Sequence, residues 1–280
     1  MRYYVSDLDG TLLGSNAELS EYSNRVLRKF LKKNKMTFFT ARSYQVAKRI
    51  LGDIPFNLPC AVLNGCYIMD YVTGEVLEQH TLERKVVNDI TEIARASDIS
   101  PIFIGNINDE EKMIYFDYYN MGYANFIEQR KEKKDKRLVK MDSLEKILLN
   151  DEFSFLTIQF VDKKEKLEYL KQKLRDYDVN LYLGEELYCK GYYYLNITPT
   201  DATKEEALEN IAELMSVDLK EFTVFGDQEN DIGMFCKAGD AFAVENAIPE
   251  LKECATGIIG ANTDEGVAKF LEKVMRCKYD

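Results

Sequence analysis

The sequence predicts an α/β protein in which a doubly wound parallel sheet is interrupted by an inserted α+β domain. Short apolar strands alternate with amphipathic helices near the start of the chain, and the alternation returns toward its end. That order is typical of a parallel sheet. The middle of the chain instead mixes helices with longer, tyrosine-rich strands. Because 280 residues suffice for two domains, we predict a core of residues 1–82 and 189–280 and an insert of residues 83–188.

The first part of the core is predicted from its apolar periodicity. Val26, Leu27, Phe30 and Leu31 recur at helical spacing. The expected strands are Arg2–Ser6, Met36–Phe39 and Ala61–Leu63, and the expected helices are Ser20–Asn34 and a second one that ends near Leu51. In open α/β sheets, ligands bind at the carboxyl ends of such strands.

The insert and the second part of the core follow. The longer strands of the insert include Met113–Tyr119 and Phe153–Val161, and the charged stretch Glu128–Lys140 is interpreted as a solvated helix or loop. The core alternation is expected to resume with a strand over Tyr192–Ile197. It continues with helix Lys204–Met215, strands Phe222–Phe225, Ala241–Val244 and Gly257–Ile259, and a last helix Asp264–Cys277.

The overall charge argues against nucleic acid as a partner. The net charge is −11, and an acidic chain gains nothing from the counterion release that drives binding to DNA or RNA. The N-terminal segment lacks the apolar region of a signal peptide, and no apolar stretch approaches membrane-spanning length. We therefore expect a cytoplasmic protein without a membrane partner, while the oligomeric state is left open.

The cysteines give no sign of a zinc site. Six are present, and none form a CxxC pair. Most lie in apolar surroundings, as Cys60 does, so they are expected to be reduced residues of the core.

The strongest chemical signal is the segment Asp7-Leu8-Asp9-Gly10-Thr11-Leu12, which directly follows an apolar strand. A phosphate ester resists an anionic nucleophile unless bound Mg²⁺ neutralises part of its charge. The Asp7 carboxylate can then attack phosphorus and form an aspartyl-phosphate. A second carboxylate, Asp9, can protonate the leaving oxygen and later activate water. Gly10 permits the sharp turn at this point.

A calcium loop and a purely structural acidic turn are the alternatives for this segment. Asp7, Asp9 and Glu18 have the spacing of three calcium ligands in an EF-hand. However, the Gly that such a loop requires at its centre is replaced by Leu12. The calcium loop is therefore disfavoured, whereas a structural turn is left open by this motif alone.

The second signal is Gly226-Asp227-Gln228-Glu229-Asn230-Asp231, which also follows a strand. Asp227 and Asp231 are four residues apart, so a helical start would bring both carboxylates to one side. Hard oxygen ligands of this kind suit Mg²⁺. Alone the segment fits a helix cap equally well, but together with the first motif it is interpreted as a metal-binding segment.

Two smaller features complete the predicted site. Thr40 ends a strand and precedes a helix, so its hydroxyl and the amide of Ala41 could hold phosphate oxygens. A plain helix cap explains Thr40 equally well. Lys204 opens a helix, where the positive end of the helix dipole disfavours a lysine. A phosphate partner would explain that position, although a solvated lysine is the commoner case.

These four elements, in this order, resemble the haloacid dehalogenase-like superfamily, and most of all its Cof-like, type IIB phosphatases. The resemblance covers nearly the whole chain. It includes Asn64-Gly65 after the third strand, Glu245-Asn246-Ala247 late in the core, and Asn262-Thr263-Asp264-Glu265-Gly266-Val267 near the end. It implies a Rossmann-like core, with the insert as a cap that covers the site and shapes substrate choice.

The resemblance also implies the roles of individual residues. Asp7 is the implied nucleophile and Asp9 the general acid and base of a Mg²⁺-dependent phosphatase that acts on a small-molecule phosphate ester. The implied Mg²⁺ ligands are Asp7, the backbone carbonyl of Asp9 and Asp227, with support from Asp231. The implied phosphate-binding groups are the backbone amides of Leu8 and Ala41 and the side chains of Thr40, Lys204 and Asn230.

The sequence departs from the family pattern at two places. The family usually has Gly where Ala41 stands, so the amide is kept but the pocket is narrower. The family often has Gly in the loop before its Lys, whereas this chain has Thr200-Asp201-Ala202-Thr203. The path of that loop is therefore in doubt, but the Lys itself is present.

Several related activities compete with phosphatase activity. P-type ATPases and dehalogenases resemble the first motif but lack the second Asp, which this chain keeps as Asp9. Phosphomutases and phosphotransferases keep both carboxylates, so the motif does not exclude them. A non-catalytic regulator that binds a sugar phosphate is a further alternative, although such drift is expected to erode a carboxylate or the Lys.

Specificity is predicted to come from the insert. The core motifs bind only phosphate and metal, and the insert is the one segment large enough to form a lid over the site. Six aromatic residues of one short stretch could contact a polar organic group such as a sugar. They are Tyr115, Phe116, Tyr118, Tyr119, Tyr123 and Phe126. The alternative for each of them is packing within the insert's own sheet, and the sequence does not choose among sugar phosphates, nucleotides and phosphorylated cofactors.

Overall fold

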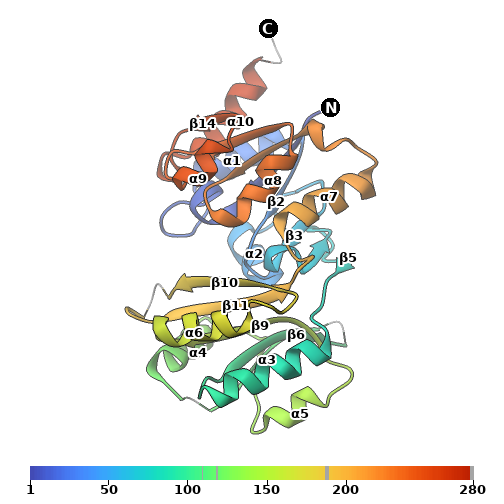
Figure 1. Cartoon of the computed structure of the whole chain (residues 1–280). Helices are drawn as coiled ribbons and strands as arrows, with labels where there is room; N and C mark the ends of the chain where they lie inside the picture. Colours follow the sequence, from blue (N-terminus) through green and yellow to red (C-terminus); the bar gives the residue numbers. More distant parts are fainter. Residues whose placement is uncertain (109, 118, 187–188, 278–280) are drawn as a thin grey trace. The chain divides into compact units, whose positions relative to one another are not determined.

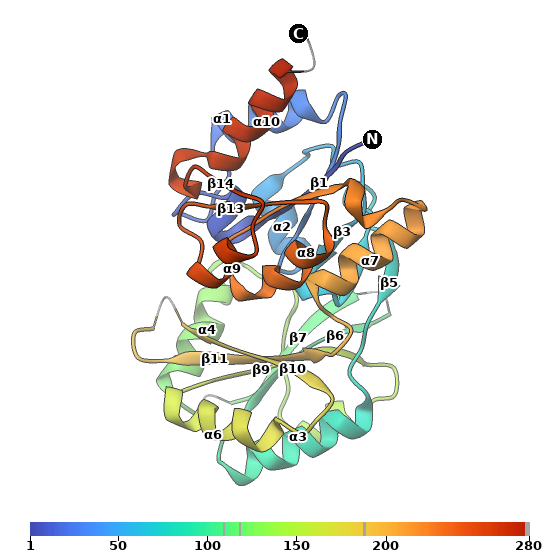
Figure 2. The same ribbon diagram turned by 45° about the horizontal axis from the view of Figure 1, so that its top comes forward.

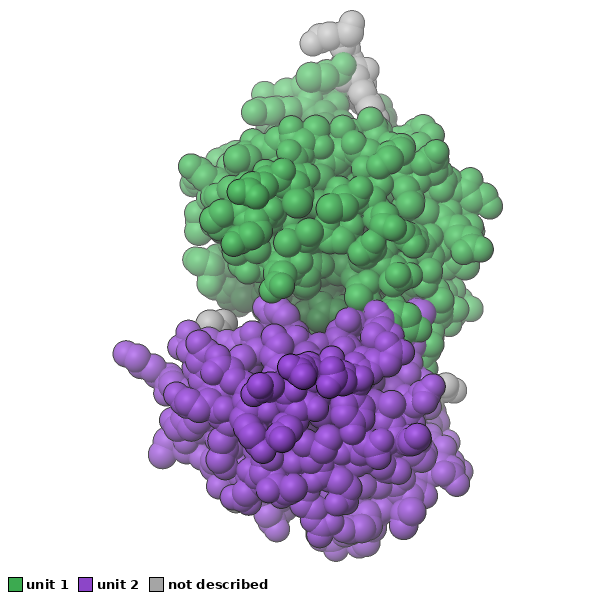
Figure 3. All heavy atoms as spheres, in the orientation of Figure 1, with its two compact units in different colours: residues 1–79, 201–280 green, residues 80–200 purple. Residues whose placement is uncertain are grey.

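The computed structural model describes residues 1–108, 110–117, 119–186 and 189–277. They form two compact units, of which unit 1 comprises residues 1–79 and 201–280 and unit 2 comprises residues 80–200 (Figure 3). Each unit is built on a sheet of its own. A mainly parallel core sheet and a separate inserted mixed sheet confirm the predicted fold class. Within the described ranges, no helix is both long and apolar enough to cross a bilayer.

The described part of unit 1 contains an eight-stranded, mainly parallel sheet. Its strands are β1 (Tyr3–Asp7), β2 (Lys35–Phe39), β3 (Cys60–Val62), β4 (Tyr67–Met69), β5 (Val76–Gln79), β12 (Phe222–Gly226), β13 (Asp240–Val244) and β14 (Gly257–Ile259). They lie in the order β14-β13-β12-β1-β2-β3-β4-β5. The pairings from β14 to β3 are parallel, whereas β4 and β5 pair in antiparallel fashion.

Helices cover both faces of this sheet. They are α1 (Glu21–Phe30), α2 (Tyr44–Leu51), α7 (Lys204–Met215), α8 (Ile232–Lys237), α9 (Pro249–Glu253) and α10 (Gly266–Cys277). Helix α1 packs against α10 and α7 packs against α8, and Figure 2 shows these pairs on opposite sides of the sheet. Short helical turns lie at Leu63–Gly65, Leu219–Glu221, Glu229–Asp231 and Asn262–Asp264.

The topology brings two loops together at the centre of the sheet. Strand β1 pairs with β2 on one side and with β12 on the other. The chain therefore leaves β1 in one direction and returns beside it much later, which makes a topological switch point where ligands bind in such sheets. The loops that follow β1 and β12 carry the two acidic motifs.

Unit 2 is built on a six-stranded mixed sheet in the described ranges. Its strands are β6 (Pro101–Ile107), β7 (Glu110–Tyr115), β8 (Leu138–Lys140), β9 (Ser154–Asp162), β10 (Val179–Glu185) and β11 (Tyr193–Pro199), and its helices are α3 (Arg84–Ala96), α4 (Met121–Glu132), α5 (Leu144–Leu148) and α6 (Lys164–Leu174) (Figure 1). The strand order is β10-β11-β9-β6-β7-β8. Apolar residues of α3, α6 and the sheet form its buried core, which includes Ile90, Phe103, Ile158 and Leu170.

One predicted strand belongs to the other sheet. The sequence predicts the strand at Tyr192–Ile197 as part of the core, but this strand, β11, pairs with β9 and β10 of unit 2. The reason is that the residue pattern of a strand predicts the strand itself but not the neighbouring strands with which it pairs. Unit 2 therefore extends to residue 200 instead of 188.

The aromatic stretch of the insert packs within unit 2. Tyr123 is fully buried, and its hydroxyl accepts a hydrogen bond from the amide of Phe116 at 2.9 Å. The hydroxyl of Tyr119 donates to the carbonyl of Val161 at 2.8 Å. Tyr115 and Phe126 are also buried, and Tyr118 lies outside the described residues. These contacts favour the packing interpretation over direct recognition of a substrate.

The cysteines only partly match the expectation of core residues. Cys60 and Cys66 are buried, whereas Cys236, Cys254 and Cys277 are exposed. The exposed three lie on or just after helices of unit 1, where apolar neighbours in the sequence can still face the sheet while the cysteine faces solvent.

Candidate active site

Asp7 is the last residue of β1, the strand at the switch point of the unit 1 sheet. Its neighbours on both sides are fully paired strands, so its side chain is buried, with 6% of its surface exposed. One of its carboxylate oxygens, Oδ1, accepts a hydrogen bond from Lys204 Nζ at 2.6 Å. A buried carboxylate at the end of a central strand is thus fixed both by the sheet and by a cation.

The turn after Asp7 brings two further loops into contact. Gly10 has a φ of +72°, and a Cβ at this position would lie 2.2 Å from Oδ2 of Asp227. No side chain fits there, which explains the glycine better than the turn alone. The hydroxyl of Thr11 donates to Asp227 Oδ1 at 3.1 Å. The loops after β1 and β12 are therefore in direct contact.

Asp9 differs from Asp7 in its surroundings. Its side chain is 47% exposed, and both of its carboxylate oxygens accept hydrogen bonds from the guanidinium of Arg42, with Nε to Oδ2 at 2.6 Å. Such bidentate pairing fixes the orientation of a carboxylate as well as its charge. Asp9 is therefore oriented by Arg42 and accessible to a molecule from solvent.

Asp227 and Asp231 lie on the loop that follows β12. The amides of Asp227 and Gln228 donate to Asp231 Oδ2 at 2.9 Å and 3.1 Å, so the short helical turn at Glu229–Asp231 brings Asp231 back under the strand end. The side chain of Gln228 donates to Asp227 Oδ2 at 3.1 Å. The expected convergence of the two carboxylates is thus present.

Lys204 lies under these carboxylates. It is the first residue of α7, whose cap residue Thr203 accepts from the amide of Glu206. Its side chain is 1% exposed, and its Nζ donates to Asp7 Oδ1 and Asp231 Oδ1, each at 2.6 Å. Lys204 is therefore a buried lysine with two carboxylate partners, and not the solvated lysine that is commoner at the first position of a helix.

Burial and charge shift the pKa values of this cluster. Burial raises the pKa of Asp7 well above its usual value against the opposing effect of Lys204, and the charges of Asp231 and Asp227 add to the rise. Burial and then Asp231 raise the pKa of Asp227. Burial alone would lower the pKa of Lys204, but Asp231 and Asp7 outweigh it and the pKa is raised. Lys204 therefore stays a cation. Its single positive charge does not offset the effect of burial and of the neighbouring carboxylates on the pKa values of Asp7 and Asp227.

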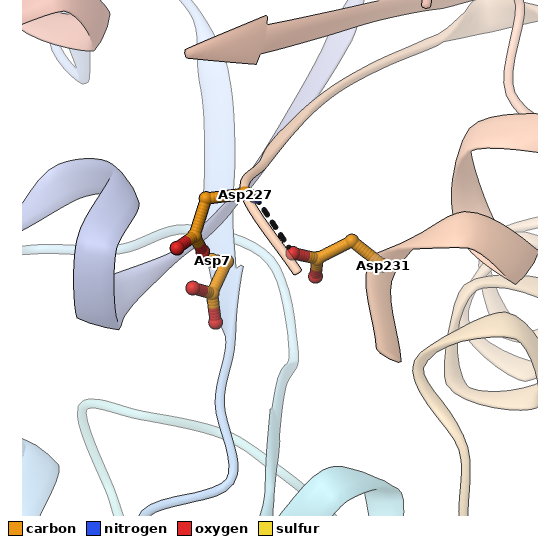
Figure 4. A group of neighbouring side chains, drawn as sticks. All are labelled: Asp7, Asp227 and Asp231. Atoms are coloured by element: carbon orange, nitrogen blue, oxygen red, sulfur yellow. Dashed lines mark hydrogen bonds between the residues drawn. The ribbon is translucent and has the colours of Figure 1, made fainter. Parts of the chain in front are cut away.

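The carboxylate cluster fits a hard divalent cation. Asp7, Asp227 and Asp231 each offer an oxygen, and these oxygens lie within 4.8 Å of one another (Figure 4). Three carboxylates and the one ammonium of Lys204 leave two negative charges in a buried place. Buried charge without compensation is costly, and oxygen-rich sets of this kind are the ligands of Mg²⁺.

The predicted phosphate-binding residues directly follow β1 and β2, lie on the loop after β12, or, for Lys204, begin α7. Leu8 directly follows Asp7 and is buried, whereas Ala41 is exposed. Thr40 is buried at the end of β2, where its hydroxyl accepts from the amide of Arg42 at 3.1 Å. It does not cap α2, which is capped by Ser43. Asn230 donates to the side chain of Asn64 at 3.2 Å, and the amide of Asn64 donates to the carbonyl of Thr40.

Three residues of this arrangement were not predicted. Arg42 binds Asp9, and Thr11 and Gln228 bind Asp227. Arg42 and Gln228 directly follow predicted residues in the sequence, and Thr11 lies two residues after Asp9. A cation directly after Thr40-Ala41 is a signal that could have pointed to Arg42. All of the predicted site residues and these three belong to unit 1.

The chain matches known proteins along its length. The family model of haloacid dehalogenase-like hydrolases matches residues 4–271. The 5-amino-6-(5-phospho-D-ribitylamino)uracil phosphatase YwtE of Bacillus subtilis is 24% identical over all of both chains. The structure of TM0651 from Thermotoga maritima is 27% identical, covers 97% of each chain and has a TM-score of 0.76. The subclass IIB sugar phosphatase BT4131 shares the fold, with 16% identity, a TM-score of 0.70 and coverage of 98% and 99%.

Proposed function

Because the chain belongs to the haloacid dehalogenase-like hydrolase family, we propose that it hydrolyses small phosphate monoesters through a phosphorylated Asp7. The observation that carries this proposal is the buried cluster of Asp7, Asp227 and Asp231 around Lys204 at the switch point of the core sheet. A buried carboxylate at a strand end, neighbouring carboxylates that can hold Mg²⁺ and a fixed cation that can contact the phosphoryl group are features that phosphoryl transfer to a carboxylate uses.

Asp7 is proposed as the nucleophile and Asp9 as the general acid and base. The buried Asp7 carboxylate attacks phosphorus, and the phosphorus–oxygen bond to the leaving group breaks. Asp9, which is half exposed and oriented by Arg42, gives a proton to the leaving oxygen. It then takes a proton from the water that cleaves the aspartyl-phosphate. The difference in burial between the two carboxylates matches the difference between these roles.

Mg²⁺ is the proposed cofactor. Asp7, Asp227 and the backbone carbonyl of Asp9 would hold it, and the ion would neutralise charge on the transferring phosphoryl group. Asp231 differs from Asp227 in its partners: its Oδ1 accepts from the ammonium of Lys204 and its Oδ2 from two amides at once, whereas each oxygen of Asp227 accepts a single neutral hydrogen bond. We therefore assign Asp231 to holding Lys204 and the metal-binding loop in place, and not to direct coordination.

The phosphate group is proposed to bind at the backbone amides of Leu8 and Ala41 and at the side chains of Thr40, Lys204 and Asn230. Lys204 is a fixed cation beside the nucleophile. The Thr40 hydroxyl accepts one hydrogen bond from Arg42, which leaves its proton for a phosphate oxygen. Hydrogen bonds from Asn230 to Asn64 and from Asn64 to Thr40 connect two of these groups, which supports the proposal.

A phosphorylated sugar or polyol is the substrate class proposed for first testing. YwtE is named for a substrate with a phosphorylated ribityl chain, and BT4131 is described as a sugar phosphatase. The residues of the unit 1 site are assigned to the metal ion and the phosphate group, and few of them could recognise the organic part of a substrate. Discrimination among esters is therefore proposed to depend on unit 2.

The proposed location of the enzyme is the cytoplasm.

The test of this function is a phosphatase assay on the full chain. We predict Mg²⁺-dependent release of p-nitrophenol and inorganic phosphate from p-nitrophenyl phosphate, lost on chelation. Asp7→Asn should lower kcat by about 10³-fold or more, because it removes the nucleophile and keeps the volume. An unchanged rate in Asp7→Asn would overturn the mechanism. Transfer of phosphate to an added sugar without release would favour a phosphotransferase, and specific binding without turnover would favour a regulator.

A further inference from the structure

Two asparagine-containing segments that the proposed function leaves without a role make contacts at the candidate site. They are Glu245-Asn246-Ala247, which follows β13, and the turn that begins at Asn262. Both lie in unit 1, on the side of the sheet that carries β12, β13 and β14. Their side chains reach the loop after β1, which is far away in the sequence.

Asn246 is exposed to solvent, yet both ends of its side chain are bonded to backbone. Its Nδ2 donates to the carbonyl of Gly10 at 2.8 Å, and its Oδ1 accepts from the amide of Asn262 at 2.9 Å. Asn262 Nδ2 donates in turn to the carbonyl of Leu13 at 2.9 Å. The two asparagines therefore hold the loop after β1 at two points, residues 10 and 13.

The connection between β13 and α9 also reaches the other acidic loop. The amide of Ile248, two residues after Asn246, donates to the carbonyl of Asp227 at 3.0 Å. Two residues of this connection, Asn246 and Ile248, thus bond to the two loops that carry the carboxylates. On the opposite side of the same turn, Gly10 lies against the Asp227 side chain.

We propose that Asn246 is a positioning residue that sets the turn carrying Asp9 against Asp227 before a metal ion binds. This inference rests on the proposed function. Glycine has more accessible backbone conformations than any other residue, and Gly10 lies at positive φ directly after Asp9, so a bond to its carbonyl removes conformations in which the Asp9 carbonyl points away. If these conformations are already excluded in the folded protein, metal binding does not have to lose the conformational entropy of ordering the turn.

The chain offers a matched control at Asn57. Its Oδ1 accepts from the amide of Met36 at 3.0 Å, and its Nδ2 donates to the carbonyl of Asn34 at 2.9 Å. Asn57 therefore ties backbone to backbone on both sides as Asn246 does, but its partners lie in the first part of β2 and just before it, at the end away from Thr40. A merely structural role predicts the same behaviour for both residues.

The experiment measures metal affinity apart from catalysis. Mn²⁺ binding to the metal-free full chain is followed by electron paramagnetic resonance, and Tm is measured in chelator. We expect Asn246→Ala to weaken Mn²⁺ binding about tenfold, the loss of roughly one hydrogen bond's worth of preorganisation. Asn57→Ala should lower Tm and leave Mn²⁺ affinity unchanged. Asn246→Asp keeps the acceptor for Asn262 but loses the donor to Gly10, so it should also bind Mn²⁺ more weakly in spite of its added charge.

Each outcome decides one question. Equal Mn²⁺ affinities of wild type and Asn246→Ala overturn the inference, as does an equal loss in Asn57→Ala. A wild-type chain that binds no Mn²⁺ overturns the metal site of the proposed function itself. Should Asn246→Ala not fold, Asn262→Ala replaces it, because it removes the bond to Leu13 and keeps the backbone amide that Asn246 accepts from. Asn262→Ala is expected to weaken Mn²⁺ binding less than tenfold, and wild-type affinity in this variant would count against the inference.

Discussion

Lys204 illustrates how a single buried charge organises the site. Its ammonium joins Asp7, at the end of β1, to Asp231, on the loop after β12. Breaking a buried ion pair by removing one partner typically costs about 3–5 kcal/mol, because the other charge is left uncompensated. Lys204 is therefore as much a structural residue as a phosphate ligand, and its loss would affect folding together with binding.

A residue of the same unit, Cys60, gives a pH-dependent test of burial. Burial raises the pKa of its thiol to about 12, whereas an exposed thiol has a pKa of about 8.5. Between these values the unfolded chain has lost the proton and the folded chain keeps it. The free energy of unfolding therefore falls as pH rises, by about 1.4 kcal/mol per pH unit, and this contribution is intact below the lower value.

The measurement is urea unfolding of wild type and Cys60→Ser from about pH 8 to about pH 10.5. Other groups titrate in both proteins and cancel in the comparison. Wild type should lose stability more steeply than Cys60→Ser by the amount given above, and Cys236→Ser, which alters an exposed thiol, should follow wild type. Parallel curves for wild type and Cys60→Ser would show that Cys60 is accessible to solvent.

At the residue scale, the acidic motifs could be predicted but some of their partners could not. Asp7 and Asp227 directly follow apolar strands, so local sequence places both at one edge of the sheet. The bond from Arg42 to Asp9 and that from Asn246 to Gly10 join residues far apart in the chain. Such contacts depend on how loops approach one another in the fold. The cation after Thr40-Ala41 points to a role for Arg42 but not to Asp9 as its partner, and no local pattern indicates the bond from Asn246 to Gly10.

At the scale of elements, the turn after β1 depends on the absence of a side chain at Gly10. Gly10 and Gly52 both have positive φ, of +72° and +63°. A Cβ at Gly10 would meet Asp227 Oδ2 at 2.2 Å, whereas a Cβ at Gly52 would meet nothing within 4 Å. Their ψ values are −5° and −128°, so both alanine variants are strained, Gly52→Ala in the less accessible region, and only Gly10→Ala adds a steric contact at the site.

We predict that Gly10→Ala loses about 1–2 kcal/mol of stability from backbone strain in addition to the cost of the clash, and that Gly52→Ala loses about 1–3 kcal/mol from strain alone. Gly10→Ala should in addition lower Mg²⁺-dependent hydrolysis about a hundredfold, because Asp227 must move. Activity and denaturant unfolding measured on both variants separate the two effects. Similar activities in the two variants would mean that Asp227 tolerates displacement.

The elements themselves were largely predictable, and the exceptions have a physical cause. Helix α7 spans Lys204–Met215 as expected, because its capping residue and apolar periodicity are local. The expected strand Met113–Tyr119 instead ends at Tyr115 as β7. Strand β11 was found by its pattern but assigned to the wrong sheet, since the pairing of a strand is decided by its partners.

At the scale of the whole molecule, we expect the two units to have different roles, with the candidate site in unit 1 and discrimination among substrates in unit 2. The candidate site lies entirely in unit 1, and the aromatic stretch of unit 2 packs within that unit. We predict that replacing residues 80–200 by a short linker leaves a core that binds Mn²⁺ but no longer discriminates among phosphate esters. A trimmed core that unfolds cooperatively and keeps the substrate ranking of the full chain would place specificity in unit 1.

The central claim is that Asp7 becomes phosphorylated, and the most direct measurement traps that intermediate. Asp9→Asn removes the group that activates water, whereas p-nitrophenol is a good leaving group that needs little acid catalysis. Rapid mixing of Asp9→Asn with Mg²⁺ and p-nitrophenyl phosphate should therefore release about one equivalent of p-nitrophenol per chain before slow turnover. Acid quenching and mass spectrometry should find one phosphoryl group on the peptide that contains Asp7, and none in Asp7→Asn. Hydrolysis without a burst and without a phosphorylated Asp7 peptide at any quench time would contradict the account.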